Sequence, residues 1–149
     1  LNSADSKNTG VISPVFLSRL REIIAATGAS VVLSSTWRNW PQLRVLIMAA
    51  LPKGSVVGQT PLEDEQVWRN DVRPREIRDF LHQIEANIGH VTSWAAIDDM
   101  DLIRQANALA CKDPSMIDFA ERLVAHFVKT EKDSGLQDPQ AAHLLQLLS

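Results

Sequence analysis

Apolar residues recur every three or four positions over much of this chain, and four short apolar runs separate those stretches. Because that spacing places apolar side chains on one helix face, it predicts helices over 14–27, 41–51 and 74–88, one starting at 113–114, and a terminal one starting at 138–139. The short runs predict strands over 30–33, 55–58, 90–97 and 126–129. Residues 59–72 carry many charges without a clear period, which predicts a loop over one edge.

Helices and strands alternate in this order, which is typical of an α/β fold with a parallel sheet and helices on both faces. The first helix has clear end signals, because Ser13 and Pro14 fit the N-cap and first helical position and Gly28 fits the C-terminal stop. No internal repeat or linker marks a second unit. We therefore expect a single domain over 1–149.

The composition is that of an ordinary globular protein, with 45% hydrophobic and 22% charged residues. A net charge of −3 gives no global basic field to attract nucleic acid or a membrane surface. The apolar runs are too short to span a membrane, and the polar first ten residues do not resemble a signal peptide. The single cysteine, Cys111, excludes an internal disulfide and favours the cytoplasm, and we expect it to be a buried apolar residue.

Two adjacent acids, Asp98 and Asp99, follow the apolar run 94–97. Neighbouring carboxylates repel one another unless a cation lies beside them, and one or two carboxylates are enough for Mg²⁺, which keeps several of its waters. The pair therefore predicts a magnesium site at the end of a strand. The alternative is that Asp98 only ends the strand and Asp99 caps the next helix.

Hydroxyl residues end another predicted strand, where Ser34 and Ser35 follow Val31–Leu33. Hydroxyls and free N–H groups before a helix can hold a phosphate oxygen, although such residues also serve as simple turns or caps. Ligands of open α/β sheets bind beyond the carboxyl ends of the strands. We therefore expect the hydroxyls and the acid pair to open onto one pocket.

Two cations, Arg73 and Arg75, stand at the start of the third predicted helix. A positive charge is unfavourable at that end of the helix dipole, which favours another purpose. A guanidinium in a phosphoryl-transfer site stabilises charge on the transferred group. The alternative is a solvated helix start.

Five segments in this order resemble the haloacid dehalogenase (HAD) superfamily of phosphohydrolases, and in particular the small HAD domains found in multi-part RNA repair proteins. They are V-V-L-S-S-T-W-R at 31–38, V-G-Q-T-P at 57–61, R-P-R-E-I at 73–77, A-I-D-D at 96–99, and H-F-V-K-T at 126–130 with G-L at 135–136. The resemblance spans nearly the whole chain. It implies a three-layer sandwich around a parallel Rossmannoid sheet.

The resemblance also implies roles for the candidate residues. Ser34 would be the hydroxyl of the second motif that binds the transferring phosphoryl group, with Ser35 beside it. Arg73 would be the cation of the third motif, although Arg75 is close enough to compete. Asp98 and Asp99 would be the carboxylates that hold Mg²⁺, and the loop over 59–72 would form a small cap or rim.

One family motif, an apolar strand that ends in D-x-D-G, is absent from this chain. Its first aspartate attacks phosphorus to form an aspartyl-phosphate, and its second acts as the acid and base. Asp5 follows no apolar strand, and the D-x-D at 99–101 comes in the wrong order. The motif would lie just upstream of Leu1. Its strand would be the central one, between the Ser34 and Asp98 strands, so we expect another segment or another chain copy to fill that place.

These features predict a cytoplasmic, Mg²⁺-dependent phosphatase that hydrolyses a phosphomonoester. Its substrate would be a phosphorylated small molecule such as a nucleotide, or a nucleic-acid end. The alternative is a catalytically inactive HAD-like module that binds or supports partners within a larger assembly.

Overall fold

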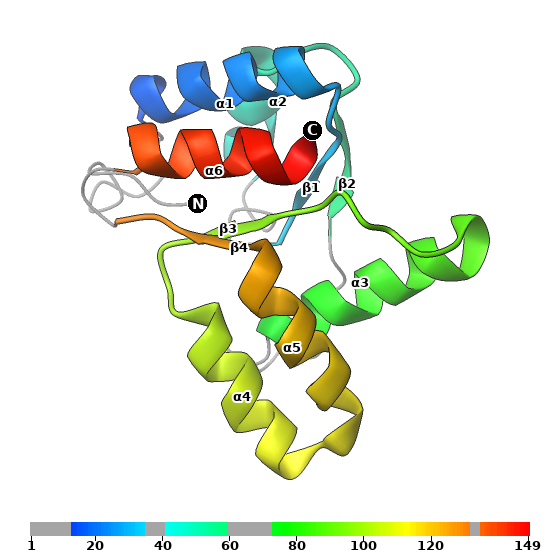
Figure 1. Ribbon diagram of the computed structural model, residues 1–149. Coiled ribbons are helices and arrows are strands. Elements are labelled where there is room, and N and C mark those ends of the chain that lie inside the picture. The colour runs from blue at the N-terminus through cyan, green and yellow to red at the C-terminus, as the bar shows by residue number, and fades with distance from the viewer. Residues whose placement is uncertain (1–12, 35–40, 60–72, 132–134) are drawn as a thin grey trace.

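The computed structural model describes residues 13–34, 41–59, 73–131 and 135–149 (Figure 1). The elements are α1 (Pro14–Thr27), β1 (Val31–Leu33), α2 (Pro41–Ala50), β2 (Val56–Gln59), α3 (Arg73–Ile88), β3 (Ala96–Asp98), α4 (Leu102–Lys112), the 3₁₀ turn η4 (Pro114–Met116), α5 (Ile117–His126), β4 (Phe127–Lys129) and α6 (Asp138–Leu148). The protein is therefore α/β and mostly helical.

Helix α1 begins and ends where its local sequence predicts. The Ser13 hydroxyl accepts a hydrogen bond from the Phe16 N–H at 3.4 Å, which satisfies one of the free donors of the first turn. Gly28 takes a left-handed conformation with φ 70° and donates its N–H to the Ile24 carbonyl at 2.8 Å. Both predicted end signals are thus confirmed.

The four strands form two separate parallel pairs within the described residues. Strand β1 pairs with β2, and β3 pairs with β4. In the second pair Asp98 lies opposite Lys129, and the Asp98 carbonyl accepts a hydrogen bond from the Thr130 N–H at 2.9 Å. The parallel direction agrees with the prediction, and the ladder between β3 and β4 ends at the acid pair.

Two apolar cores flank the β3–β4 pair. One joins α1, α2, β1, β4 and α6, and the other joins α3, α4, η4, α5, β3 and β4. Adjacent residues of β4 point to opposite cores, because side chains alternate along a strand: Val128 packs in the first core and Phe127 in the second. Figure 1 shows α1 and α6 on one side of this strand pair and α4 and α5 on the other.

Helix α4 was not among the predicted elements. Leu102, Ala106 and Leu109 are its buried residues, at helical spacing, and the Asp101 carboxylate caps its first turn by accepting the Arg104 N–H at 3.1 Å. The helix begins only four residues after β3. The acidic residues among 98–101 gave no apolar pattern from which its start could be predicted. The chain returns through η4 and α5 before it enters β4.

The strand predicted over 90–97 is wrong in extent, because β3 covers only Ala96–Asp98. Side chains, rather than a strand ladder, take up backbone groups of the preceding segment. The Glu85 carboxylate accepts the Val91 N–H at 2.7 Å, and the His126 ring lies 2.8 Å from the Trp94 carbonyl. These contacts leave the segment in an irregular path.

Burial corrects two further expectations. In α5 the helical spacing of Ile117, Ala120, Leu123 and Val124 predicts that Val124 faces inward, but that residue is 60% exposed. The buried face instead includes Phe119, Ala120 and Leu123. Cys111 is exposed rather than buried, since it lies two positions beyond Leu109, off the inner face of α4. Among the described residues, the structure contains no helix with the length and apolar character that a membrane crossing requires.

Candidate functional site

The carboxylate of Asp98, the last residue of β3, is held from several sides. Its Oδ2 lies 2.5 Å from Nη1 of Arg73, and its Oδ1 accepts the Met100 N–H at 3.0 Å. Its side chain is only 2% exposed. The Thr130 N–H bonds the Asp98 main-chain carbonyl and fixes the strand end beneath it. These contacts give the carboxylate one orientation.

The charge of Asp98 is stabilised although the group is buried. Burial raises the pKa of this carboxyl, but nearby positive charge, including that of the Arg73 guanidinium, and the Met100 N–H lower it, and the net pKa lies below the usual value. The group is therefore ionised at neutral pH. An ionised carboxylate at the carboxyl end of a strand can attract a second cation.

Arg73 is the first residue of α3, and its side chain is 9% exposed. A solvated helix start is therefore the wrong description of this arginine. The guanidinium extends from the positive end of the helix dipole to the Asp98 carboxylate, and it also lies 4.0 Å from the Met100 sulfur. Its role toward a phosphoryl group stays a prediction.

Arg75 turns toward a different partner. Its Nε lies 3.8 Å from Oδ2 of Asp113, the residue that precedes η4. Two residues along a helix correspond to about 200° of rotation, so Arg73 and Arg75 leave α3 on nearly opposite faces. Of these two arginines, Arg73 is the one with a described contact to Asp98.

Asp99 follows β3 and is half-buried. It does not cap the next helix, because Asp101 occupies the N-cap of α4. The alternative in which Asp99 serves as that cap is therefore wrong. Its part in holding a metal ion stays a prediction.

The hydroxyl pair is described only in part. Ser34 directly follows β1 and is half-buried, whereas Ser35 lies outside the described residues. Ser34 follows Leu33, which is fully buried in the core that β4 also lines. That Ser34 and Asp98 open onto one pocket stays a prediction.

Two buried polar residues near this strand end had no predicted role. Glu76, on the first turn of α3 with Arg73, is 4% exposed, and Thr130, just beyond β4, is 0% exposed. The Thr130 hydroxyl has no hydrogen-bond partner among the described residues. Glu76 lies within the R-P-R-E-I segment, three positions after Arg73. Thr130 lies at a strand end beside Asp98, and that position is the signal that could have identified it.

The donor chemistry of the acid pair fits Mg²⁺. Within the described ranges, no group of three or more His, Cys, Asp or Glu side chains could hold a metal ion. Mg²⁺ nevertheless prefers oxygen ligands and is commonly bound through one or two carboxylates plus water and phosphate. Asp98 supplies an ionised, oriented carboxylate, and Asp99 is its neighbour. Cysteine and histidine, which zinc prefers, are absent from this pair.

Comparisons with known proteins gave one result. No curated protein and no solved structure matched the chain. A family model described as the HAD domain in Swiss Army Knife RNA repair proteins matches residues 2–141. This match covers most of the chain, including both strand pairs and the Arg73–Asp98 contact. The chain therefore belongs to this family of HAD domains.

Proposed function

We propose that this chain forms the body of a Mg²⁺-dependent phosphatase that hydrolyses phosphomonoesters through an aspartyl-phosphate. The observation that carries the proposal is the buried contact between Arg73 and Asp98 at the carboxyl end of β3. A buried ion pair is weak evidence for stability alone, because desolvation offsets much of the attraction. A phosphoryl-transfer site, by contrast, needs both a fixed carboxylate and a fixed cation.

In this proposal each candidate residue has one task. Asp98 and Asp99 hold Mg²⁺, and Arg73 stabilises charge on the phosphoryl group. Ser34 and Ser35 bind its oxygens, and Arg75 is the less favoured cation because it faces Asp113. When bound, Mg²⁺ neutralises charge on the phosphate. The nucleophilic aspartate belongs to a D-x-D-G segment that we expect upstream of Leu1.

The two strand pairs support a place for that segment. In the part of the chain that the structure describes, β1 is paired only with β2, and β3 only with β4. Buried strand edges need hydrogen-bond partners. We infer that a further parallel strand lies between β1 and β3 and joins the pairs into the central layer of a three-layer sandwich. A preceding segment of the same protein is the simplest source, and another copy of the chain is the second.

The substrate that we propose is a nucleotide or a phosphorylated nucleic-acid end, in the cytoplasm. The family description supports the nucleic-acid end, since the matched domains occur in RNA repair proteins. The net charge of −3 means that such a substrate would be held by local groups such as Arg73 rather than by a general basic surface.

The test is hydrolysis by the full-length natural protein, which includes the D-x-D-G segment that we expect. We expect Mg²⁺-dependent release of phosphate from p-nitrophenyl phosphate and from oligonucleotides with a terminal phosphate, and loss of activity with a chelator. Oligonucleotides without a terminal phosphate are the control. No hydrolysis of either substrate with Mg²⁺ at any pH would overturn the proposal in favour of an inactive module that binds or supports partners.

A further inference from the structure

The contact between Arg73 and Asp98 joins two groups that the proposed function assigns to different ligands. Asp98 is assigned to a cation, and Arg73 to the phosphoryl anion. In the structure each serves instead as the other's counter-ion, with Nη1 of Arg73 2.5 Å from Oδ2 of Asp98 and both side chains buried. While this contact persists, Nη1 of Arg73 and Oδ2 of Asp98 are engaged with each other rather than with a ligand.

We propose that this ion pair is a resting contact that both ligands open, so that Mg²⁺ and the phosphoryl ligand bind cooperatively. The inference rests on the proposed function, since it needs a metal ion at Asp98 and a phosphoryl group near Arg73. It adds that Arg73 occupies the cation's place when no metal is bound.

The contacts of Asp98 show why a cation and Arg73 compete. The Met100 N–H takes one carboxylate oxygen, and the guanidinium takes the other. The Thr130 N–H anchors the main chain, so the carboxylate has little freedom to turn away. A divalent ion on this carboxylate would lie within a few ångströms of the guanidinium, and like charges at that separation in a buried site repel strongly.

Cooperativity follows from thermodynamic linkage. The first ligand to bind must separate the ion pair, and that cost lowers its apparent affinity. The second ligand finds its partner already released and bears no such cost. The coupling is reciprocal, and coupling of this kind typically changes affinity by about 5- to 150-fold.

Direct attraction between Mg²⁺ and phosphate also produces cooperativity, so the decisive measurement uses the metal alone. Without the guanidinium, Oδ2 of Asp98 loses the positive group that the structure places against it. Arg73→Met should therefore bind Mg²⁺ more tightly than the wild type, by roughly tenfold. If Arg73 only shaped the site, its removal would weaken Mg²⁺ binding or leave it unchanged.

The melting temperature gives an independent test of whether Mg²⁺ can replace the Arg73 guanidinium beside Asp98. Removing Arg73 takes away the counter-ion that the structure places against the buried Asp98 carboxylate, which destabilises the fold. Saturating Mg²⁺ should replace the lost charge, so its addition should raise the melting temperature of Arg73→Met more than that of the wild type. The exchange account fails if Mg²⁺ raises both melting temperatures equally.

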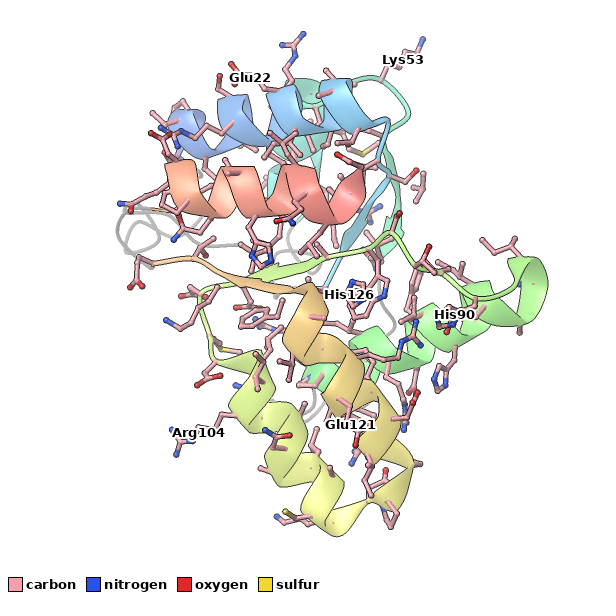
Figure 2. All side chains as sticks on the ribbon, in the orientation of Figure 1. Glu22, Lys53, His90, Arg104, Glu121 and His126 are labelled. Carbon is pink, nitrogen blue, oxygen red and sulfur yellow. The ribbon has the colours of Figure 1, made fainter. Side chains whose placement is uncertain are left out.

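The experiment is calorimetric titration of the full-length natural protein with MgCl₂, with and without inorganic phosphate. Arg104→Met is the matched control, because it removes an arginine whose exposed side chain points away from the body of the protein at α4 (Figure 2). We expect control and wild type to bind Mg²⁺ equally, and Arg73→Met to bind it about tenfold more tightly. Equal or weaker binding by Arg73→Met overturns the inference.

Two further arrangements keep the test decisive. If Arg73→Met does not fold, the ¹⁵Nε signal of Arg73 in the wild type is followed during a Mg²⁺ titration, with Arg73→Lys to assign it. We expect that signal to move and the signal of Arg104 to stay, and an unmoved Arg73 signal while Mg²⁺ binds overturns the inference. If Mg²⁺ binds to neither wild type nor Arg73→Met, the metal site of the proposed function itself is wrong.

Discussion

Glu85 of α3 and Arg122 of α5 form a two-pronged ion pair. Nη1 of Arg122 lies 3.0 Å from Oε1 of Glu85, and Nη2 lies 3.1 Å from Oε2. The Arg122 Nη2 also donates to the Val91 carbonyl, and its guanidinium lies 5.8 Å from the Trp94 ring centroid. The pair therefore fixes the end of α3 and the segment before β3 to α5, whereas the acid pair begins at the last residue of β3.

This ion pair predicts an acid-dependent loss of stability. The hydrogen bond from Arg122, followed by that from the Val91 N–H, lowers the pKa of Glu85 from 4.5 to about 2. A carboxyl group whose pKa is lower in the folded state than in the unfolded state stabilises the fold. That contribution is present in full above the unfolded-state pKa and disappears as the pH falls toward the folded-state pKa. Glu85→Gln should cost roughly 2 kcal/mol at pH 7 and progressively less between pH 4.5 and 2.

Urea unfolding of wild type and Glu85→Gln over that pH range measures the difference. The exposed Glu121→Gln on α5 is the control and should show little pH-dependent difference. A Glu85→Gln deficit that stayed constant down to pH 2 would contradict the pKa assigned to this carboxyl.

Neighbouring residues of α5 should respond very differently to truncation. Leu123 is 0% exposed in the second core, whereas Val124 is 60% exposed. Leu123→Ala should destabilise the fold by about 2–5 kcal/mol, because it removes buried methyl groups and leaves a cavity. Val124→Ala should change stability by less than about 0.5 kcal/mol. Comparable losses in urea unfolding would show that the helix face is misassigned.

Gly28 should be sensitive to substitution for a backbone reason alone. Its φ is 70°, and a Cβ built there meets no heavy atom within 4 Å. Gly28→Ala should therefore cost about 1 kcal/mol, through the left-handed conformation and not through a clash. Gly58→Ala is the control, since it also meets no atom within 4 Å and its φ is not left-handed. Thermal unfolding in which Gly28→Ala is as stable as the wild type would count against this cap.

Ser34→Ala tests the hydroxyl that we place on the phosphoryl group. Loss of one such donor should lower kcat by about 10²- to 10³-fold and leave the fold intact. The measurement is Mg²⁺-dependent hydrolysis of p-nitrophenyl phosphate, with circular dichroism as the check on folding. Ser115→Ala, remote in sequence and bonded to Arg78 and Asp113, is the control. An unchanged kcat in Ser34→Ala would exclude Ser34 from the reaction.

Local signals in the sequence predicted much of the fold. Ser13 and Gly28 mark the ends of α1 through contacts within a few residues, and the short apolar runs 31–33 and 127–129 lie within strands. The buried face of α5 was harder to predict, because Ile117, Ala120, Leu123 and Val124 also fit one helical face. Contacts within the second core, including the stacking of Phe119 on Trp94, decide that Phe119 turns inward and Val124 outward.

The candidate site was predictable as residue types but not as contacts. Arg73 and Asp98 were both candidates, yet their pairing joins residues 25 positions apart and depends on how α3 packs near the end of β3. Helix geometry places Arg73 and Arg75 on nearly opposite faces of α3, but only the packing of α3 decides that Arg73 faces Asp98 and Arg75 faces Asp113. Burial of Glu76 and Thr130 is likewise a tertiary property, since neither residue type is usually buried.

Replacement of the Asp98 carboxylate tests the central claim most directly. The measurement is Mg²⁺-dependent hydrolysis of p-nitrophenyl phosphate by the full-length protein, with Asp98→Asn compared with Asp101→Asn below the melting temperature of each. Asparagine also caps helices well, so Asp101→Asn should keep both fold and activity. We predict that Asp98→Asn abolishes hydrolysis while circular dichroism stays native. A folded Asp98→Asn variant with a near-normal rate would contradict the assignment of the metal and phosphoryl site to this strand end.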